Sequence, residues 1–149
     1  MISQELKDKL VALSKEAQEN AYVPYSLFPV GAALVTTDGD FFIGCNVENV
    51  CYGLGICGER TAVFKMISKK GPHAKIKAIA VTSKTDMPLT PCGACRQVIL
   101  EFSTRETAII YKGEETFEVH SIDYFLPGAF SKFVAVSEDD VSKFIQKDE

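Results

Sequence analysis

Residues 30–45 read VGAALVTTDGDFFIGC, two apolar runs separated by a short polar segment. Val30–Thr36 and Phe41–Cys45 have the apolar, β-rich composition of strands, and Asp38-Gly39 between them is a strong signal for a tight hairpin turn. Two strands joined by so short a turn run antiparallel. The stretch therefore predicts an antiparallel hairpin, with which the sheet of the molecule begins.

A helix is predicted before the hairpin, and helices alternate with strands after it. Near the N-terminus, apolar residues recur at spacings of three and four, as in an amphipathic helix: Ile2, Leu6, Leu10, Leu13 and Ala17. Ser3 is the expected N-cap of this helix, which ends near Asn20. Beyond the hairpin, the sequence predicts a helix over 57–69, a strand over 75–82, a helix over 92–102, strands over 107–111 and 116–120, and a helix over 138–146. With loops over 22–28 and 46–56, this order indicates a three-layer α/β fold around a mixed sheet.

Length and composition limit the kind of protein that this can be. The chain has 149 residues, of which 46% are hydrophobic, and we expect residues 1–149 to form a single domain. A net charge of −4 argues against a nucleic-acid partner, because such partners are bound through an excess of Lys and Arg. The opening MISQELKDKL lacks the apolar run of a signal peptide, and no stretch is apolar enough to span a bilayer. We therefore expect a cytoplasmic protein with no membrane partner.

The cysteines point to a metal site. There are five of them, an odd number that cannot all pair within one chain, and clustered cysteines in a reducing compartment are more often metal ligands or catalytic groups. The segment PCGAC at 91–95 places a Cys-x-x-Cys at a predicted helix start, where both sulfurs can face one point and the helix dipole favours thiolates. Two thiolates are an incomplete zinc site. Cys57 is the best third ligand, because it also lies at a predicted helix start and Glu59 follows two residues later.

Other interpretations of the cysteines remain open from these motifs alone. The Cys-x-x-Cys could be a redox pair or two partly buried thiols. A closed structural zinc site would need a fourth ligand, which could come from Cys45, Cys51, His73 or His120. We interpret both histidines as ordinary surface or loop residues, Cys45 as a core residue at the end of a strand, and Cys51 as structural.

Ligation by Cys57, Cys92 and Cys95 would leave one tetrahedral position for water, which distinguishes a catalytic zinc from a structural one. Zinc lowers the pKa of water that it binds from 15.7 towards about 7, and Glu59 could take up the proton and deliver it to a substrate. Zinc enzymes that deaminate bases carry a His-x-Glu or Cys-x-Glu segment followed by Pro-Cys-x-x-Cys. The segment CGE at 57–59 followed by PCGAC at 91–95 matches the second form, and the combination is far more specific than either half.

Several further segments agree with one family: YSLFPVGAA at 25–33, GCNVEN at 44–49, YG at 52–53, ERTA at 59–62 and LPGAF at 126–130. On these motifs the chain resembles the small, homotetrameric, zinc-dependent cytidine deaminases over nearly its whole length. The resemblance implies a three-layer α/β/α sandwich with a mixed five-stranded sheet. It also implies hydrolytic deamination of cytidine and deoxycytidine to uridine and deoxyuridine with release of ammonia, as in pyrimidine salvage. One zinc ion per chain and a homotetramer with shared active sites are implied as well.

The resemblance assigns substrate-binding roles residue by residue. Asn46 and Glu48 match residues that hold the ribose hydroxyls, and Phe28 matches one that packs against the pyrimidine. The backbone at Gly58 matches the donor to the base carbonyl, and the carbonyl of Thr90 matches the acceptor for the amine. Taken without the family pattern, the first three would be two polar loop residues and a core aromatic.

Two further matches concern neighbouring subunits, and two positions depart from the family. Phe130 matches a residue that reaches the base in a neighbouring subunit's site, and Tyr52 matches one that acts across an interface. Gly58 stands where the family usually has Ala, so we expect a looser turn there. Cys51 stands where Ala or Ser is common, which adds a thiol near the site.

Arg60 is expected to support the zinc site. Zinc with three thiolates carries a formal charge of −1 and is a weaker Lewis acid than zinc with neutral histidines. Arg60 lies about one helical turn after Cys57, and its planar fork can donate to thiolate sulfurs and offset their charge. The alternative is a surface arginine in an ion pair.

Two other functions remain open from the sequence. One is a closed structural zinc module, in which Glu59 would have no evident task. The other is a related deaminase that acts on a nucleoside antibiotic or on a polynucleotide. The pair of Asn46 and Glu48 favours a free ribose, and the acidic composition argues against a polynucleotide.

Overall fold

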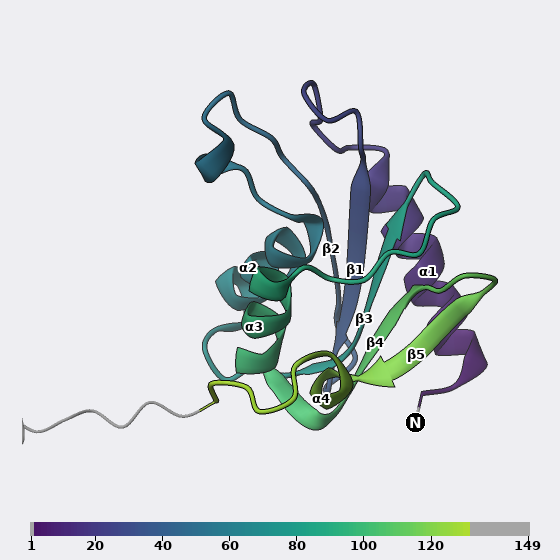
Figure 1. The fold of residues 1–149 in the computed structure, drawn as a ribbon. Helices are drawn as coiled ribbons and strands as arrows, with labels where there is room; N and C mark the ends of the chain where they lie inside the picture. The colour runs from purple at the N-terminus through teal and green to yellow at the C-terminus, as the bar shows by residue number, and fades with distance from the viewer. Residues whose placement is uncertain (1, 132–149) are drawn as a thin grey trace, which may run out of the picture.

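The chain folds as one sheet with helices on both faces (Figure 1). The computed structural model describes residues 2–131. The strands are β1 (Val30–Thr36), β2 (Phe41–Cys45), β3 (Ile76–Ser83), β4 (Ser103–Lys112) and β5 (Phe117–Ser121). The helices are α1 (Gln4–Gln18), the 3₁₀ helix η1 (Tyr52–Leu54), α2 (Gly58–Lys70), α3 (Gly93–Glu101) and α4 (Ile122–Phe125).

The sheet has five strands in the order β2-β1-β3-β4-β5. The hairpin of β1 and β2 is antiparallel, as predicted, and Gly39 in its turn has a φ of 96°. β3 and β4 run parallel, with α3 as the crossover between them, whereas β1 pairs antiparallel with β3 and β4 with β5. In Figure 1, α1 covers one face and α2 and α3 cover the other. The predicted α/β/α sandwich with a mixed five-stranded sheet is therefore confirmed.

The core has two layers, because both faces of the sheet are covered. Successive residues of a strand point to opposite faces, so Leu34 packs with Met66 beneath α2 while Val35 packs with Leu10 beneath α1. Burying a side chain of this size stabilises the fold by about 1.5–3 kcal/mol relative to leaving it exposed. The continuous apolar runs of β1 and β3 follow from this double coverage.

Two glycines let the helices approach the hairpin closely. A Cβ at Gly31 would lie 1.9 Å from the carbonyl oxygen of Ser14, and a Cβ at Gly44 would lie 2.4 Å from the backbone nitrogen of Ala62. Any side chain at either position would force a helix off the sheet. The contact at Gly44 holds the first turns of α2 against β2, and the N-terminus of α2 is where the candidate site begins.

Most element boundaries agree with the prediction to within one residue, and the differences have simple causes. Ser3 caps α1 and accepts a hydrogen bond from the backbone N–H of Leu6 at 3.2 Å. β4 begins at Ser103, four residues before the predicted start. The prediction missed this first part of the strand because residues 104–106 are exposed and polar and do not show the apolar pattern of a strand. The single turn α4 was not predicted, and the predicted helix at 138–146 lies outside the described residues. None of the helices within residues 2–131 is long and apolar enough to cross a membrane.

Candidate active site

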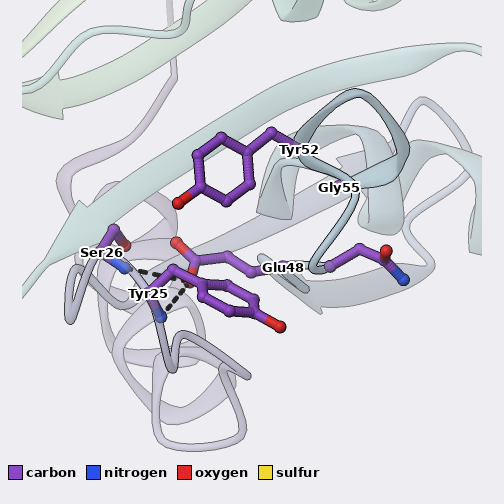
Figure 2. Close-up of a pocket in the computed structure, with 6 residues that line it drawn as sticks. Tyr25, Ser26, Glu48, Tyr52 and Gly55 are labelled. Carbon is purple, nitrogen blue, oxygen red and sulfur yellow. Dashed lines mark hydrogen bonds between the residues drawn. The ribbon is translucent and has the colours of Figure 1, made fainter.

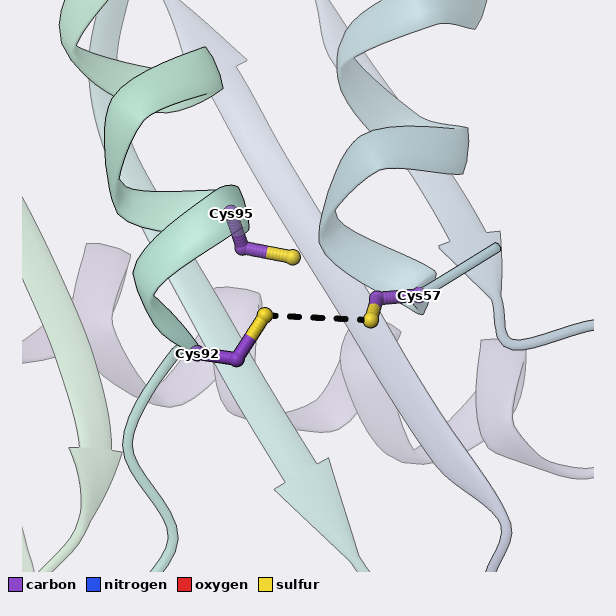
Figure 3. Close-up of side chains that lie close together, drawn as sticks. All are labelled: Cys57, Cys92 and Cys95. Carbon is purple, nitrogen blue, oxygen red and sulfur yellow. Dashed lines mark hydrogen bonds between the residues drawn. The ribbon is translucent and has the colours of Figure 1, made fainter. Parts of the chain in front are cut away.

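Two helix N-termini bring three cysteines together. Cys57 is the N-cap of α2, Cys92 is the N-cap of α3, and Cys95 lies in the first turn of α3. The two helices lie side by side, and Figure 3 shows the three side chains pointing into the space between them. Their sulfur atoms all lie within 4.8 Å of one another, with 3.9 Å between Cys57 Sγ and Cys92 Sγ. The prediction that these N-termini converge is confirmed.

The cluster fits a tetrahedral zinc ion. Zinc binds cysteine sulfur at about 2.3 Å, which separates two sulfurs of a tetrahedral site by about 3.8 Å. Among residues 2–131, no further His, Cys, Asp or Glu joins the three sulfurs in a metal-ligating group. The donor set is therefore three thiols, which is the number of protein ligands in a catalytic zinc site and one fewer than in a closed structural site.

The alternative ligands lie elsewhere. Cys45 is half-buried rather than in the core, and its thiol donates to the carbonyl oxygen of Asn20 at 3.3 Å. Cys51 is exposed in the loop before η1. His73 is exposed after α2, as predicted. His120 lies in β5 rather than in a loop, stacked on Tyr124 with a ring distance of 4.1 Å.

The surroundings of Cys57 favour a thiolate. A hydrogen bond from Cys95 is the largest cause, hydrogen bonding from Arg60 adds to it, and together they lower the pKa of Cys57 to about 5. The pKa of Cys95 is raised, because its thiol makes that hydrogen bond and lies buried. Arg60 donates from Nη2 to Cys57 Sγ at 3.4 Å, so its guanidinium faces a sulfur atom of the thiol cluster rather than an acidic side chain.

Glu59 lies beside the cluster with its side chain withdrawn from solvent. It is only 4% exposed, in the first turn of α2. Burial, with a smaller contribution from the neighbouring Cys57 thiolate, raises the pKa of Glu59 to about 7. The residue lines the pocket onto which Cys57 and Cys92 also open.

That pocket has a volume of about 450 Å³ and draws its walls from several separate segments of the chain. Its lining comprises Ser26, Phe28, Val30, Asn46, Glu48, Cys57, Glu59, Val81, Leu89, Thr90 and Cys92. The structure thus brings Phe28, Asn46, Glu48 and Thr90 to the thiol cluster, as the resemblance implies. Four lining residues were not assigned to the site from the sequence: Ser26, Val30, Val81 and Leu89. Ser26 and Val30 each lie two residues from Phe28, and Leu89 precedes Thr90, whereas no motif marked Val81.

Asn46 and Glu48 also hold the loop around the pocket, which sequence reasoning missed. The amide of Asn46 donates from Nδ2 to the carbonyl oxygen of Phe28 at 2.9 Å, and its Oδ1 accepts from the N–H of Val30 at 2.8 Å. Glu48 accepts hydrogen bonds from the backbone N–H groups of Tyr25 at 2.9 Å and Ser26 at 3.2 Å (Figure 2). Hydrogen bonding, chiefly from the side chain of Ser26, lowers the pKa of Glu48.

Tyr52 and Phe130 stand apart from the thiol pocket of their own chain. Tyr52 is 80% exposed and lines a neighbouring hollow of about 400 Å³ with Tyr25 and Glu48, as Figure 2 shows. Phe130 is 69% exposed, and its carbonyl oxygen accepts a hydrogen bond from Gln97. Neither residue lines the pocket that contains Glu59.

Gly58 departs from our expectation of a looser turn. A Cβ at this position would lie 3.1 Å from the carbonyl oxygen of Val30 and 3.3 Å from that of Gly44. The backbone of β1 and β2 therefore lies tightly against the first residue of α2, and glycine fills the space that remains.

Comparison with known proteins agrees with this geometry. Residues 4–111 match the family model of the cytidine and deoxycytidylate deaminase zinc-binding region. The cytidine deaminase of Sporosarcina psychrophila is 50% identical over 128 residues, which cover 84% of this chain and 91% of the relative. A probable cytidine deaminase of Dictyostelium discoideum is 42% identical over 142 residues, covering 93% of this chain and 95% of that protein. The crystal structure of cytidine deaminase from Burkholderia pseudomallei has a TM-score of 0.77 and 43% identity, and the match covers 87% of this chain and 100% of that one. This chain therefore belongs to the family of cytidine and deoxycytidylate deaminases.

Proposed function

We propose that this protein catalyses the zinc-dependent hydrolytic deamination of cytidine and deoxycytidine, producing uridine or deoxyuridine and ammonia. One observation carries the proposal: thiols of the cluster and the buried carboxyl of Glu59 open onto the same pocket of about 450 Å³. A pocket of that volume is in the range that holds small-molecule ligands. Membership of the deaminase family supports the same chemistry.

Glu59 is the residue that we assign to proton transfer. Zinc held by Cys57, Cys92 and Cys95 would supply Lewis-acid activation of water, lowering its pKa from 15.7 to about 7. The Glu59 carboxylate accepts the proton that the attacking water loses and delivers it to N3 of the base. Once the bond from C4 to oxygen has formed, Glu59 takes the second proton from the hydroxyl on C4 and passes it to the amine, so that the carbonyl of uridine forms as the bond from C4 to nitrogen breaks. Water and cytidine are thereby converted to uridine and ammonia.

The remaining pocket residues orient the nucleoside. Phe28 packs against the pyrimidine, and Asn46 and Glu48 bind the ribose hydroxyls; all three line the pocket, which supports this assignment. The N–H of Gly58 donates to the base carbonyl, since the first N–H groups of a helix have no partner within it. The carbonyl of Thr90 accepts from the amine. Asn46 keeps one N–H of its amide for the substrate, because its other bonds go to Phe28 and Val30.

The active sites are completed between subunits of a homotetramer. Two loops that contribute residues to the pocket or continue from it carry exposed apolar side chains, namely Tyr22, Tyr25, Leu27, Val50, Tyr52 and Leu54, and Phe130 is exposed separately after α4. Exposed apolar groupings of this kind mark interaction surfaces. The positions of Tyr52 and Phe130 outside their own pocket support contributions to a neighbour's site. The reaction belongs in the cytoplasm, where thiol ligands remain reduced, and the five free cysteines suit that compartment.

The decisive test is conversion of cytidine, deoxycytidine and free cytosine by the purified zinc-loaded protein, followed by ultraviolet absorbance. We expect both nucleosides to be converted and cytosine to be nearly inert, because it lacks the ribose that Asn46 and Glu48 bind. Glu59→Gln is the control, since it keeps the shape of the side chain and cannot accept the proton. Its turnover should fall by about 10²–10⁴-fold with zinc retained. A zinc-bound protein that converts neither nucleoside would leave only a structural zinc module, and conversion of a single-stranded oligonucleotide alone would indicate the polynucleotide deaminase.

A further inference from the structure

Arg96 makes three directed hydrogen bonds beside the thiol cluster, and none of them reaches a sulfur atom. It follows Cys95 on α3 and is half-buried. Its Nε donates to the carbonyl oxygen of Pro91 at 2.7 Å, and its Nη2 donates to Thr90 Oγ1 at 3.1 Å. Its Nη1 donates to the carbonyl oxygen of Phe125 in α4 at 3.1 Å, and the guanidinium lies 5.2 Å from the centre of the Phe125 ring.

Two of these bonds bracket a single peptide group. The carbonyl of Thr90 belongs to the peptide group that joins Thr90 to Pro91. Arg96 binds the Thr90 hydroxyl before this peptide group and the Pro91 carbonyl after it. Proline has no N–H, so this peptide cannot be held by a hydrogen bond of its own nitrogen. Upstream, the chain is fixed where the N–H of Leu89 donates to the carbonyl oxygen of Lys112 at 2.9 Å. Between that point and Cys92, the bonds from Arg96 fix the path of the chain.

The third bond ties the same segment to rigid structure. Phe125 is 8% exposed and packs edge-on against Tyr111 with a ring distance of 5.1 Å, so its carbonyl is a fixed anchor for the guanidinium. The partners of Arg96 are all uncharged oxygens. A positive charge alone therefore does not explain the residue, whereas a planar fork with several donors in fixed directions does.

We propose that Arg96 is a positioning residue that orients the Thr90 carbonyl toward the 4-amino group of the substrate. This inference rests on the proposed function, in which that carbonyl accepts from the amine. It adds a separate claim: the orientation of the carbonyl is imposed by α3 through the guanidinium fork. Arg96 touches neither the substrate nor the metal ligands' sulfur atoms and acts through the main chain of residues 90–91.

The test compares a substrate that has the amine with a ligand that lacks it. Arg96→Lys keeps the positive charge but replaces the planar guanidinium, with its several fixed donors, by a single ammonium nitrogen. We expect kcat/KM for cytidine to fall by about 10- to 100-fold, since a misplacement of about 1 Å in a site can cost 10²-fold. The inhibition constant of a pyrimidin-2-one ribonucleoside, which has hydrogen in place of the 4-amino group, should change far less. Zinc content and melting temperature are measured on the same samples.

Two further variants separate positioning from folding. Thr90→Val removes one acceptor of the fork and keeps the backbone carbonyl, so it should reproduce part of the loss. In the Arg96→Lys background it should add little, because both changes break the same interaction. Arg105→Lys, at an exposed position in β4, is the matched control and should behave as wild type.

The outcomes distinguish this inference from the proposed function. If the wild-type protein does not convert cytidine, the proposed function fails and Arg96 is not at issue. If the wild type is active and Arg96→Lys keeps its kcat/KM for cytidine, the positioning role is wrong. An equal loss for cytidine and for the amine-free ligand would overturn it too, because general damage to the pocket does not distinguish the two molecules.

Discussion

Nη2 of Arg60 lies 3.4 Å from Sγ of Cys57, the N-cap residue of α2, which is three residues earlier in the chain. The contact raises the pKa of Arg60, since its hydrogen bond to the Cys57 sulfur stabilises the charged guanidinium. We propose that this guanidinium would withdraw electron density from the Cys57 thiolate when the thiol cluster holds zinc, and would so make the zinc ion a better Lewis acid. The N-termini of α2 and α3 act in the same direction through their dipoles.

Arg60→Gln tests how much this contact contributes to catalysis. We expect kcat to fall about 10- to 100-fold with one zinc per chain retained, because a hydrogen bond to a charged group contributes about 1.5–3 kcal/mol. Arg60→Lys keeps the charge and should lose less. Steady-state kinetics and metal analysis on both variants provide the measurement. An unchanged kcat in Arg60→Gln would show that the helix dipoles suffice and that Arg60 is structural.

Zinc binding should depend on three of the five cysteines. Changing Cys57, Cys92 or Cys95 to Ala removes a ligand, so each variant should lose zinc and unfold at a lower temperature, because binding of a metal to the native state contributes to folding. Cys45→Ala and Cys51→Ala are matched controls, since both residues lie outside the cluster. Metal analysis and X-ray absorption at the zinc edge measure the outcome. A histidine nitrogen or a fourth protein ligand in the spectrum would contradict the open site.

The parts of this fold that were predictable are those governed by local signals. Asp38-Gly39 between two apolar runs indicated the hairpin, and Ser3 indicated the start of α1, because turns and caps depend on nearby residues. The early start of β4 was not predictable. Its first residues are polar and exposed, and the pairing of Ser103 with Ile76 depends on contacts distant in sequence.

In the candidate site, too, features set by local sequence were predictable and features set by contacts distant in sequence were not. Cys57, Cys92 and Cys95 could be proposed from spacing, because few residue types bind zinc and helix starts favour thiolates. Spacing could not predict the hydrogen bonds from Arg96 to three oxygens or those of Asn46 to its own loop, because these bonds depend on the exact path of irregular segments of the chain. Motifs identify the chemistry of such a site, whereas its rigidity depends on the tertiary structure.

Gly58→Ala should weaken substrate binding more than catalysis. The new Cβ would lie 3.1 Å from the Val30 carbonyl and 3.4 Å from the N–H nitrogen of Asn46, which donates to that carbonyl. The Val30 carbonyl must shift by a few tenths of an ångström, and both Val30 and Asn46 line the pocket, so we expect KM to rise with kcat changed less. Removing glycine from a helix contributes about 0.5–1 kcal/mol of stability and offsets the strain. A large loss of zinc or of thermal stability would contradict this account.

The stability of the protein should fall in acid partly through Asp38. The hydrogen bond from Lys70, at 2.5 Å, is the main cause that lowers the pKa of Asp38 from 3.8 to about 2. A depressed pKa means that this contribution is fully present above pH 3.8 and is lost as the pH falls toward 2. Asp38→Asn keeps a good turn residue and removes the charge. The difference in free energy of unfolding between wild type and this variant should therefore shrink across that interval, and a constant difference would contradict the assignment. Asp86→Asn, at an exposed position, is the control.

Mixed assemblies of the proposed homotetramer should show whether Phe130 acts in a neighbouring site. Phe130→Ala removes an aromatic ring that is 69% exposed in its own chain, and it should raise KM through lost packing on the base. Glu59→Gln should abolish proton transfer in the subunit that carries it. When the two variants are unfolded together and refolded, some sites combine an intact Glu59 from one subunit with an intact Phe130 from another. Activity at low cytidine concentration should then exceed that of either variant refolded alone. If Phe130 served its own chain, every site would still lack one of the two groups and mixing would restore nothing.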